Sequence, residues 1–566
     1  MGTVYRDLKD RREVLLIYTQ RWIPGRPFEL VQSLGGLTLA AVLREYGFTA
    51  KSFTGITTDV VRLIRKRADS LFAVCFYCDF DNLGAIRSIL KTLQGEPFYK
   101  LVGGPQTLHL APGQIPDLGA DAVLCGDGEE SLPRWLKEHV RADGCHDPLP
   151  QETTHEKKGE FELLSDFRRY PYADDTLSLN RPGLLLSVIS ARGCPHRCAF
   201  CFEGGNSKTL RQRPVEEVLE EIEYRLSRSR QLKYLFFADD TFTCDIRRLE
   251  RFLDGLARIR ETHDLVWFCE GHASFFRKHP DAMAKMVRAG MVRMQIGMES
   301  GNDQVLAMYG KHICADDIRY TAQLAWDASL PQLCGNFIIG GALESAETLA
   351  QTKEFARGLL RDFPGLLDLS TTFPMPLPGT LLTREPEHYG LSWTDPEFVT
   401  SLEDVPVNRT AFLGQEQICT ARASFLHMVL SEMRELAAAG KIPEERIRRS
   451  LELSFRYGIV DSWCSYVYRK DAQLFAYYRA VVTAQLSEWT QICGDPRPEQ
   501  TVPVLVLSLR ETSRDISEEL MRILSLADGR SLKELQVETG YGDGRFYELM
   551  QEAQERHLLL FWEVAI

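Results

Sequence analysis

Three cysteines stand close enough together in the sequence to hold one inorganic centre. Cys194, Cys198 and Cys201 lie within eight residues, and the next cysteine, Cys244, follows 43 residues later. Thiolates in a short loop are typical ligands of iron–sulfur clusters, whereas structural zinc normally has four protein ligands. A zinc knuckle and three incidental buried thiols are the alternatives. The spacing favours a [4Fe-4S] cluster with one open iron, to which a substrate can bind.

The cysteine loop follows the first strand of a long alternating series. Strands are expected at 184–189, 233–238, 265–269, 292–297, 333–339 and 368–373, with helices between them, such as the one that begins after Pro214. Repeated strand–helix units predict a barrel-like parallel sheet, and active sites lie at the carboxyl ends of its strands. We therefore expect a partial (β/α)6 barrel at 181–385, with the cysteines at its active end.

The motifs that follow the cysteine loop resemble those of the radical S-adenosylmethionine (SAM) superfamily in their order. They are FADDTF at 237–242, GMESG at 297–301, FIIGG at 337–341 and PLPGT at 376–380. The resemblance implies a [4Fe-4S] cluster that binds SAM, with Asp239, Gly297, Glu299 and Ser300 contacting the cofactor. Asp239 and Asp240 alternatively cap the next helix, and Glu299 alternatively lies at the surface.

Residues 1–140 form a second alternating series. Strands are expected at 14–18, 71–76, 99–102 and 122–124, and helices at 36–46, 59–68 and 82–94. This pattern predicts a doubly wound, Rossmann-like parallel sheet, whose ligands lie beyond the carboxyl ends of the strands. The motifs LGGL at 34–37, GGP at 103–105 and GDGE at 126–129 resemble the cobalamin-binding domain that precedes one branch of radical SAM enzymes.

This second resemblance implies a set of cobalamin contacts at the strand ends. They are Phe76, Tyr77, Cys78, Gly103, Gly104, Gly126, Gly128 and Glu129. No DxHxxG motif occurs in residues 1–140, so no histidine is nominated as lower ligand of the cobalt, and the loop 76–79 is expected to meet the lower face. Cys78 is a cobalt ligand if it reaches the metal, and plain packing is the alternative.

One strand end departs from the usual family pattern. The strand at 265–269 is followed by Glu270, Gly271 and His272, where many relatives carry an arginine followed by an acid. We expect Glu270 to face the cluster opening, where it binds the free iron or acts as a base; a carboxylate held by a neighbouring arginine is the alternative. Tyr309 would then be the acid–base partner of an indole NH, with a core tyrosine as its alternative.

The two resemblances together imply an activity. They imply a cobalamin-dependent radical SAM methyltransferase of natural-product, for example peptide antibiotic, biosynthesis. It would move a methyl group from SAM through methylcobalamin to a substrate carbon, with tryptophan C2 as one candidate. The alternative is a cobalamin-dependent radical SAM enzyme that rearranges or cyclises its substrate without methylating it. A small-molecule or peptide substrate and an external electron donor of the flavodoxin or ferredoxin type are the expected partners.

Composition and charge exclude other classes. The chain has 566 residues, 44% hydrophobic and 26% charged, which is typical of a globular protein of several domains. Its net charge of −12 disfavours nucleic acid as a partner. Its longest apolar runs are shorter than the roughly 18 residues of a membrane span. The charged segment 1–13 does not resemble a signal peptide, so we expect a cytoplasmic protein without a membrane partner.

The remaining segments complete the predicted organisation. Residues 141–180 are polar without periodicity and are interpreted as a linker, and residues 386–495 as a helical region. Residues 496–566 predict a small winged-helix-like module. The module resembles units that recognise leader peptides of ribosomally made natural products, and a purely structural cap is the alternative.

Overall fold

The computed structural model describes most of the two predicted sheets and part of the C-terminal region. The described residues are 8, 11–20, 33–79, 82–110, 118–140, 172–173, 179, 185–206, 210–229, 232–394, 405–457, 459, 489–491, 504–506, 517–526, 532–555 and 559–564. The predicted linker at 141–180 therefore lies almost wholly outside the described residues, and the domain boundaries stay predictions.

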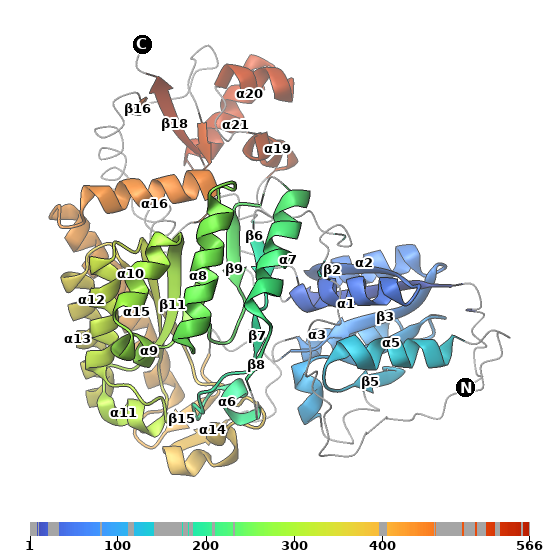
Figure 1. Ribbon diagram of the computed structural model, residues 1–566, viewed down its shortest axis with the longest axis horizontal. Coiled ribbons are helices and arrows are strands. Elements are labelled where there is room, and N and C mark those ends of the chain that lie inside the picture. The colour runs from blue at the N-terminus through green and yellow to red at the C-terminus, as the bar shows by residue number, and fades with distance from the viewer. Residues whose placement is uncertain are drawn as a thin grey trace.

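The N-terminal region is a five-stranded parallel sheet with helices on both faces (Figure 1). Its strands β1 (Glu13–Gln20), β2 (Thr49–Ile56), β3 (Leu71–Tyr77), β4 (Tyr99–Gly103) and β5 (Ala122–Leu124) have the order β2-β1-β3-β4-β5. The helices are α1 (Leu34–Glu45), α2 (Thr57–Arg67), α3 (Leu83–Thr92) and α5 (Gly128–His139), with a 3-10 turn η1 (Pro105–His109). The predicted Rossmann-like sheet is confirmed. The edge strand β2 was not predicted because its polar residues hide the apolar alternation.

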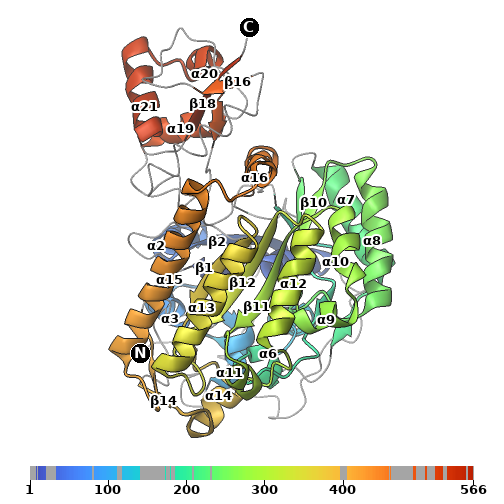
Figure 2. The same ribbon diagram turned by 90° about the vertical axis from the view of Figure 1, so that its left-hand side faces the viewer.

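The second region is a six-stranded parallel sheet that does not close. Its strands are β6 (Leu185–Val188), β9 (Tyr234–Phe237), β10 (Val266–Gly271), β11 (Met291–Glu299), β12 (Gln332–Ile338) and β13 (Leu367–Thr372), in the order β13-β12-β11-β10-β9-β6. Helices α7 (Val215–Arg228), α8 (Ile246–Arg260), α9 (Ala273–Lys278), α10 (Asp281–Arg288), α11 (Asp303–Met308), α12 (Ala315–Asp327) and α13 (Ala346–Asp362) accompany it (Figure 2). The predicted partial (β/α)6 barrel is confirmed, with β6 and β13 at its edges.

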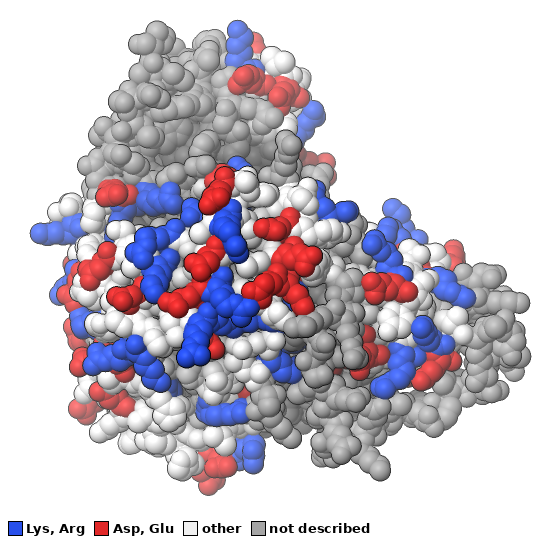
Figure 3. Space-filling view, viewed as in Figure 1, with Lys and Arg blue, Asp and Glu red and all other residues white. Residues whose placement is uncertain are grey.

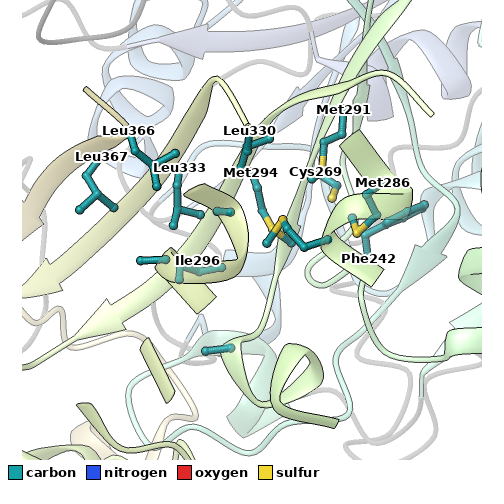
Figure 4. Packing of buried hydrophobic residues seen from close by; sticks show 14 of the residues in the cluster. Phe242, Cys269, Met286, Met291, Met294, Ile296, Leu330, Leu333, Leu366 and Leu367 are labelled. Carbon is teal, nitrogen blue, oxygen red and sulfur yellow. The ribbon is translucent and has the colours of Figure 1, made fainter. Parts of the chain in front are cut away.

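Side chains alternate along each barrel strand between an outer apolar face, packed against the helices, and an inner face with polar groups. Cys269 and Met294 pack among apolar side chains between sheet and helices (Figure 4), and Trp267 lies in the same core. Because successive side chains of a strand point to opposite faces, Phe268 and Glu270 lie on the inner face of the sheet. Both are half-buried. The outer face therefore supplies stability, and the inner face is available for ligands.

The chain beyond the barrel is helical, followed by a small helix-and-sheet module. Its elements are α14 (Leu381–Arg384), η4 (Pro386–Tyr389), β14 (Leu391–Trp393), β15 (Asn408–Thr410), α15 (Gln415–Ala438), α16 (Glu444–Tyr457), β16 (Trp489–Gln491), β17 (Val504–Val506), α19 (Glu518–Leu526), α20 (Leu532–Thr539), α21 (Asp543–Glu555) and β18 (Leu559–Val564). The strand pair β14–β15 and the strand β16 fall inside the stretch predicted to be helical. They were not predicted, because three-residue strands leave no periodic signal. The three helices and the sheet β16-β18-β17 agree with the predicted winged-helix-like module.

Two general features of the described residues are the distribution of surface charge and the polarity of the helices. On the face shown in Figure 3, acidic and basic side chains are interspersed over the barrel helices rather than gathered by sign. Among the helices in the described part of the chain, none has both the length and the apolar character needed to cross a membrane.

Candidate functional site

A cavity of about 270 Å³ lies at the carboxyl ends of the barrel strands. Its wall combines thiols, carboxylates, imidazoles, amides and apolar groups. The lining includes Cys194, Cys198, Cys201, Asp240, Glu270, His272, Gln295, Gly297, Glu299 and Lys311, with Phe373, Pro374 and Met375 after β13. The three predicted cluster ligands and three predicted SAM or catalytic residues, Glu270, Gly297 and Glu299, thus meet in one space.

The cysteine loop is tied at its base. Its flanks β7 (Ala191–Arg192) and β8 (Arg211–Gln212) pair antiparallel, and a short helix α6 (Phe202–Asn206) follows the last cysteine. The backbone N–H of Ala199 donates to the carbonyl of Tyr309 at 2.8 Å, which holds the loop against the barrel. Burial raises the pKa of Cys194 to about 12 and that of Cys198 to about 11, and a bound metal centre would stabilise their thiolate forms.

The three thiols at the cavity are a donor set for an iron–sulfur cluster. Among the described residues no three His, Cys, Asp or Glu side chains converge closely enough to chelate one metal ion. A zinc ion draws its ligands to a common centre, whereas each thiolate of a [4Fe-4S] cluster binds a different iron. Three cysteines that line one cavity are a donor set that fits a [4Fe-4S] cluster.

The two adjacent aspartates at the end of β9 have different roles. Asp239 is buried and accepts from the backbone N–H groups of Ser190 at 2.6 Å and Ala191 at 3.1 Å. Burial raises its pKa to about 6. Asp240 is exposed to the cavity and accepts from the N–H of Gly193 at 3.0 Å. Asp239 thus shapes the segment before the cysteines rather than the cavity. Neither aspartate caps the next helix, because Asp245 does so.

Glu270 lies on the cavity wall, as predicted for its strand end. It is in register with Gln295 of β11, whose side-chain amide donates to the carboxylate at 3.3 Å. Burial, followed by the repulsion of Asp240, raises the pKa of Glu270 to about 7, while Arg293 opposes the shift. No arginine of the described chain forms an ion pair with Glu270. The carboxylate is therefore weakly held and faces the space that the cysteines line.

The GMESG segment supplies a buried ion pair. Lys311 donates from Nζ to Glu299 at 2.8 Å, and both side chains are buried. The surface alternative for Glu299 is thus wrong. Gly297 is required here, because a Cβ atom would stand 2.0 Å from the carboxylate of Glu299. Ser300 is not among the cavity-lining residues; its hydroxyl bonds Thr352 at 2.9 Å.

Tyr309 does not reach this cavity. Its side chain is fully buried, and its hydroxyl accepts from the backbone N–H of Ala342 at 3.2 Å. Burial raises its pKa well above the usual value. The structure therefore places Tyr309 between the GMESG and FIIGG segments, and its proposed acid–base role stays a prediction that the cavity does not support.

The carboxyl ends of the N-terminal strands form the second predicted site. Tyr77 is exposed, whereas Phe76 and Cys78 are buried. Gly104 has φ +115°, and a Cβ atom on it would stand 2.5 Å from the carbonyl oxygen of Cys78. Burial raises the pKa of the Cys78 thiol to about 12. The loop 76–79 thus packs on the Gly-Gly-Pro turn, and Cys78 is a core residue in this conformation.

The GDGE turn of the N-terminal sheet contacts the barrel. Arg192, two residues before Cys194, is paired with Asp127 at 2.9 Å and with Glu129, and Arg211 is paired with Asp127 at 2.7 Å. Glu129 is buried, as an ion-pair partner. Gly126 has φ +85°, which glycine adopts without strain, and Gly128 lies against Leu39. The strand ends of the two sheets therefore meet beside the cysteine loop.

Sequence reasoning missed three charged residues of this region: Lys311, Arg192 and Arg211. Each pairs with an acid from a distant element, so neither periodicity nor a local motif marks it. His272 was quoted only as part of a motif, yet it lines the cavity and its ring stacks on that of His196 with centroids 3.8 Å apart. The only sequence signal for Arg192 is its place directly before Gly193 and Cys194.

Comparison with known proteins decides the family. The sequence profile of the Radical SAM superfamily matches residues 188–356. An uncharacterized methyltransferase of Pyrococcus horikoshii is 32% identical over 370 residues, which are 62% of this chain and 77% of that protein. The chain belongs to the radical SAM superfamily. Membership implies a [4Fe-4S] cluster and SAM. Cys194, Cys198 and Cys201 stay the predicted cluster ligands, and the cavity that they line is the candidate site.

Other relatives of this radical SAM protein are more distant. The anaerobic magnesium-protoporphyrin IX monomethyl ester cyclase of Rubrivivax gelatinosus is 26% identical over 30% of this chain and 29% of that enzyme. The solved structure of the radical SAM methyltransferase TsrM from Kitasatospora setae, with cobalamin and a [4Fe-4S] cluster bound, covers 84% of this chain and 99% of its own, with a TM-score of 0.58 and 15% identity. The cobalamin-dependent SAM radical enzyme OxsB with aqua-cobalamin bound covers 96% and 81%, with a TM-score of 0.53 and 15% identity. These structures share the fold of both sheets.

Proposed function

We propose that this radical SAM protein is a cobalamin-dependent methyltransferase that carries a methyl group from SAM to a carbon of its substrate. One observation carries the proposal: the strand ends of a Rossmann-like sheet are joined to the cysteine loop of a radical SAM barrel by Arg192. Two solved enzymes of the same fold contain cobalamin, and a relative at 32% identity is called a methyltransferase. The expected natural-product substrate, small molecule or peptide, belongs to the same proposal.

Different residues of the chain would hold the cluster, SAM and cobalamin. When bound, cobalamin would supply a methyl carrier, and the cluster a binding site for SAM and an electron. The cysteines hold the cluster, Gly297 leaves room for a cofactor backbone, and Lys311 fixes the Glu299 carboxylate in the wall. Tyr77 is the exposed side chain of the predicted cobalamin site. Gly103, Gly104 and Gly126 leave its floor free of side chains.

Glu270 favours one form of this chemistry. The Glu270 carboxylate lies in the cavity lined by the cysteines and has no arginine partner in the described chain. It is therefore suited to bind iron as a hard ligand, or to act as a base with a pKa of about 7. As an iron ligand it would take the open position of the cluster that SAM would otherwise occupy. We therefore propose methyl transfer without radical cleavage of SAM. A solved structure of the radical SAM methyltransferase TsrM contains tryptophan as its substrate, which makes an indole carbon one candidate acceptor for this chain. An external flavodoxin or ferredoxin is then needed only to reduce cobalt.

Product analysis tests the proposal. Purified protein is reconstituted with iron, sulfide and cobalamin, then incubated with SAM, a low-potential reductant and L-tryptophan or an indole-containing peptide. We expect S-adenosylhomocysteine and a methylated indole by mass spectrometry, without 5'-deoxyadenosine. Release of 5'-deoxyadenosine without methylated product would contradict methyl transfer and indicate a radical rearrangement or cyclisation. Protein prepared without cobalamin is the control and should form neither product.

A further inference from the structure

The ammonium group of Lys311 lies in the wall of the cavity at the barrel strand ends. Among the described residues that line this cavity, Lys311 is the only lysine or arginine, whereas Asp240, Glu270 and Glu299 contribute carboxylates. The imidazole of His272 is neutral, because burial, followed by the charge of Lys311, lowers its pKa to about 2. Cluster thiolates would add further negative charge. Lys311 is therefore the group in this wall that can offset it.

Packing against the cysteine loop sets the position of Lys311. The chain after α11 meets this loop through Tyr309, whose ring contacts that of Phe200 edge-on, with centroids 5.1 Å apart. Two residues later, Nζ of Lys311 lies 5.7 Å from the centre of the Phe200 ring. Phe200 stands between Cys198 and Cys201 in the sequence. The ammonium group is thus held beside the segment that carries two of the three predicted cluster ligands.

The ion pair with Glu299 does not cancel the charge of Lys311 at the thiols. Nζ donates to the carboxylate at 2.8 Å, and the two side chains are only 7% and 5% exposed. Burial raises the pKa of Cys198; among its charged neighbours Lys311 acts most strongly and lowers this pKa, and Glu299 raises it by less. Because the interaction between charges weakens with distance, this order puts the ammonium group closer to Cys198 than the carboxylate. Glu299 thus acts as a tether, and the positive end of the pair faces the cysteine.

A charge in this position matters because a reduced cluster is more negative than an oxidised one. The reduction potential of an iron–sulfur cluster depends on its net charge, on hydrogen bonds to its sulfurs and on solvent exposure. Lys311 remains protonated: burial would lower its pKa, but Glu299 and Cys198 raise it above the usual value. A buried cation stabilises the more negative state most. Lys311 should therefore raise the reduction potential of a cluster bound by these cysteines.

We propose that Lys311 is the counter-charge of the [4Fe-4S] cluster and that its ammonium group, tethered by Glu299, sets the reduction potential of the cluster. In the step concerned, an external one-electron donor gives one electron to the cluster; no bond forms or breaks, and Lys311 keeps its proton. A carboxylate of Glu270 on the open iron would add negative charge and increase the need for this cation. The inference rests on the cluster site of the proposed function, but it holds whether or not SAM is cleaved, because it concerns the cluster alone.

A redox titration followed by electron paramagnetic resonance tests the proposal on protein reconstituted with iron and sulfide alone. Lys311→Met removes the charge and keeps a long side chain. We expect the equilibrium constant for one-electron reduction of the cluster to fall about tenfold, which corresponds to a midpoint potential about 59 mV lower. Lys311→Arg retains the charge and should recover most of the loss. Lys353→Met is the matched control, because Lys353 contacts Ser424 outside the cavity lining, and the potential should not change.

Two further variants separate the counter-charge from a purely structural ion pair. Lys311→Met leaves Glu299 buried without its partner, so Lys311→Met combined with Glu299→Gln removes both charges. The potential of this double variant should stay below that of the wild type; a return to the wild-type potential would mean that the pair is only structural, and would overturn the proposal. Glu299→Gln alone should raise the potential, because the carboxylate no longer offsets the ammonium group. This variant decides the matter if Lys311→Met does not retain its iron, and an unchanged or lower potential in it overturns the proposal.

The outcomes for this inference and for the proposed function are distinct. Lys311→Met with the wild-type potential but weaker binding of SAM, measured by isothermal titration calorimetry, would make Lys311 a SAM contact and overturn the counter-charge alone. Protein that shows the expected shift in potential but releases 5'-deoxyadenosine without methylated product retains the counter-charge and overturns the proposed methyl transfer.

Discussion

The two parallel sheets follow the same rule of architecture but offer different chemistry at their strand ends. In the barrel, the ends of β10 and β11 and the cysteine loop leave an open cavity lined by thiols and by Glu270. In the N-terminal sheet, the loop after β3 packs against the turn after β4, and the backbone N–H of Cys78 donates to the carbonyl of Gly103 at 2.6 Å. The strand ends of the barrel thus present reactive side chains, whereas this part of the N-terminal sheet presents mostly backbone groups.

The difference shows how the two halves depend on each other. The acidic residues of the N-terminal edge, Asp127 and Glu129, are neutralised by arginines of the barrel. A large cofactor bound at this edge would therefore rest on backbone and on Tyr77, and its position would be set through Arg192. The barrel edge is, by contrast, built from its own side chains. Substitutions in the barrel should remove chemistry, and those in the N-terminal sheet should change stability and alignment.

The largest effect is expected from Cys198→Ala. Because each thiolate binds a separate iron, loss of one leaves a cluster with too few ligands, and both bound iron and product formation should fall to background. Iron and sulfide analysis after reconstitution measures the first, and the product assay the second. Cys244→Ala is the matched control, since this thiol lies outside the loop and contacts Gln212. Full iron content in Cys198→Ala would contradict the assignment.

The sequence predicted correctly those elements whose residues form a continuous pattern along the chain. The six barrel strands each carry apolar residues that pack against the helices, which makes them recognisable in the sequence, and the cysteines fall within one loop. The strand β2 has fewer apolar residues and was missed. The choice between Asp239 and Asp240 was also beyond the sequence: adjacent residues point in opposite directions, and only the fold shows that Asp240 meets the cavity.

Prediction failed where a site depends on two distant elements. Lys311 pairs with Glu299 from beyond a helix, and Arg192 pairs with Glu129 across 63 residues. A buried ion pair has no periodic or local pattern, because its energy depends on geometry that the whole fold creates. The acid–base role predicted for Tyr309 failed for the same reason. Only the fold shows that its hydroxyl accepts a hydrogen bond from the backbone N–H of Ala342 instead of facing the cavity.

An intermediate effect is expected from Glu129→Gln, which tests the dependence between the halves. Glu129 and Arg192 are both largely buried, so removing one charge leaves the other partly uncompensated, at about 2–3 kcal/mol of the free energy of unfolding. Urea unfolding followed by far-UV circular dichroism measures the loss. Glu138→Gln, on the exposed side of the same helix, should cost less than about 0.5 kcal/mol. Equal midpoints for the two variants would show that the halves are independent.

The smallest effect is expected from Cys78→Ala, which asks whether the N-terminal edge contributes a cobalt ligand at all. The thiol is fully buried among apolar residues, so the sulfur is packed away from a ligand at the strand ends, and burial raises its pKa to about 12. Its loss should cost about 1 kcal/mol as a small cavity and leave the absorption spectrum of bound cobalamin unchanged. A shifted spectrum in Cys78→Ala, with cobalamin still bound in equal amount, would instead mean that this loop opens and that its sulfur reaches the lower face of the corrin. In that case the N-terminal edge, like the barrel edge, would act through a side chain of its own.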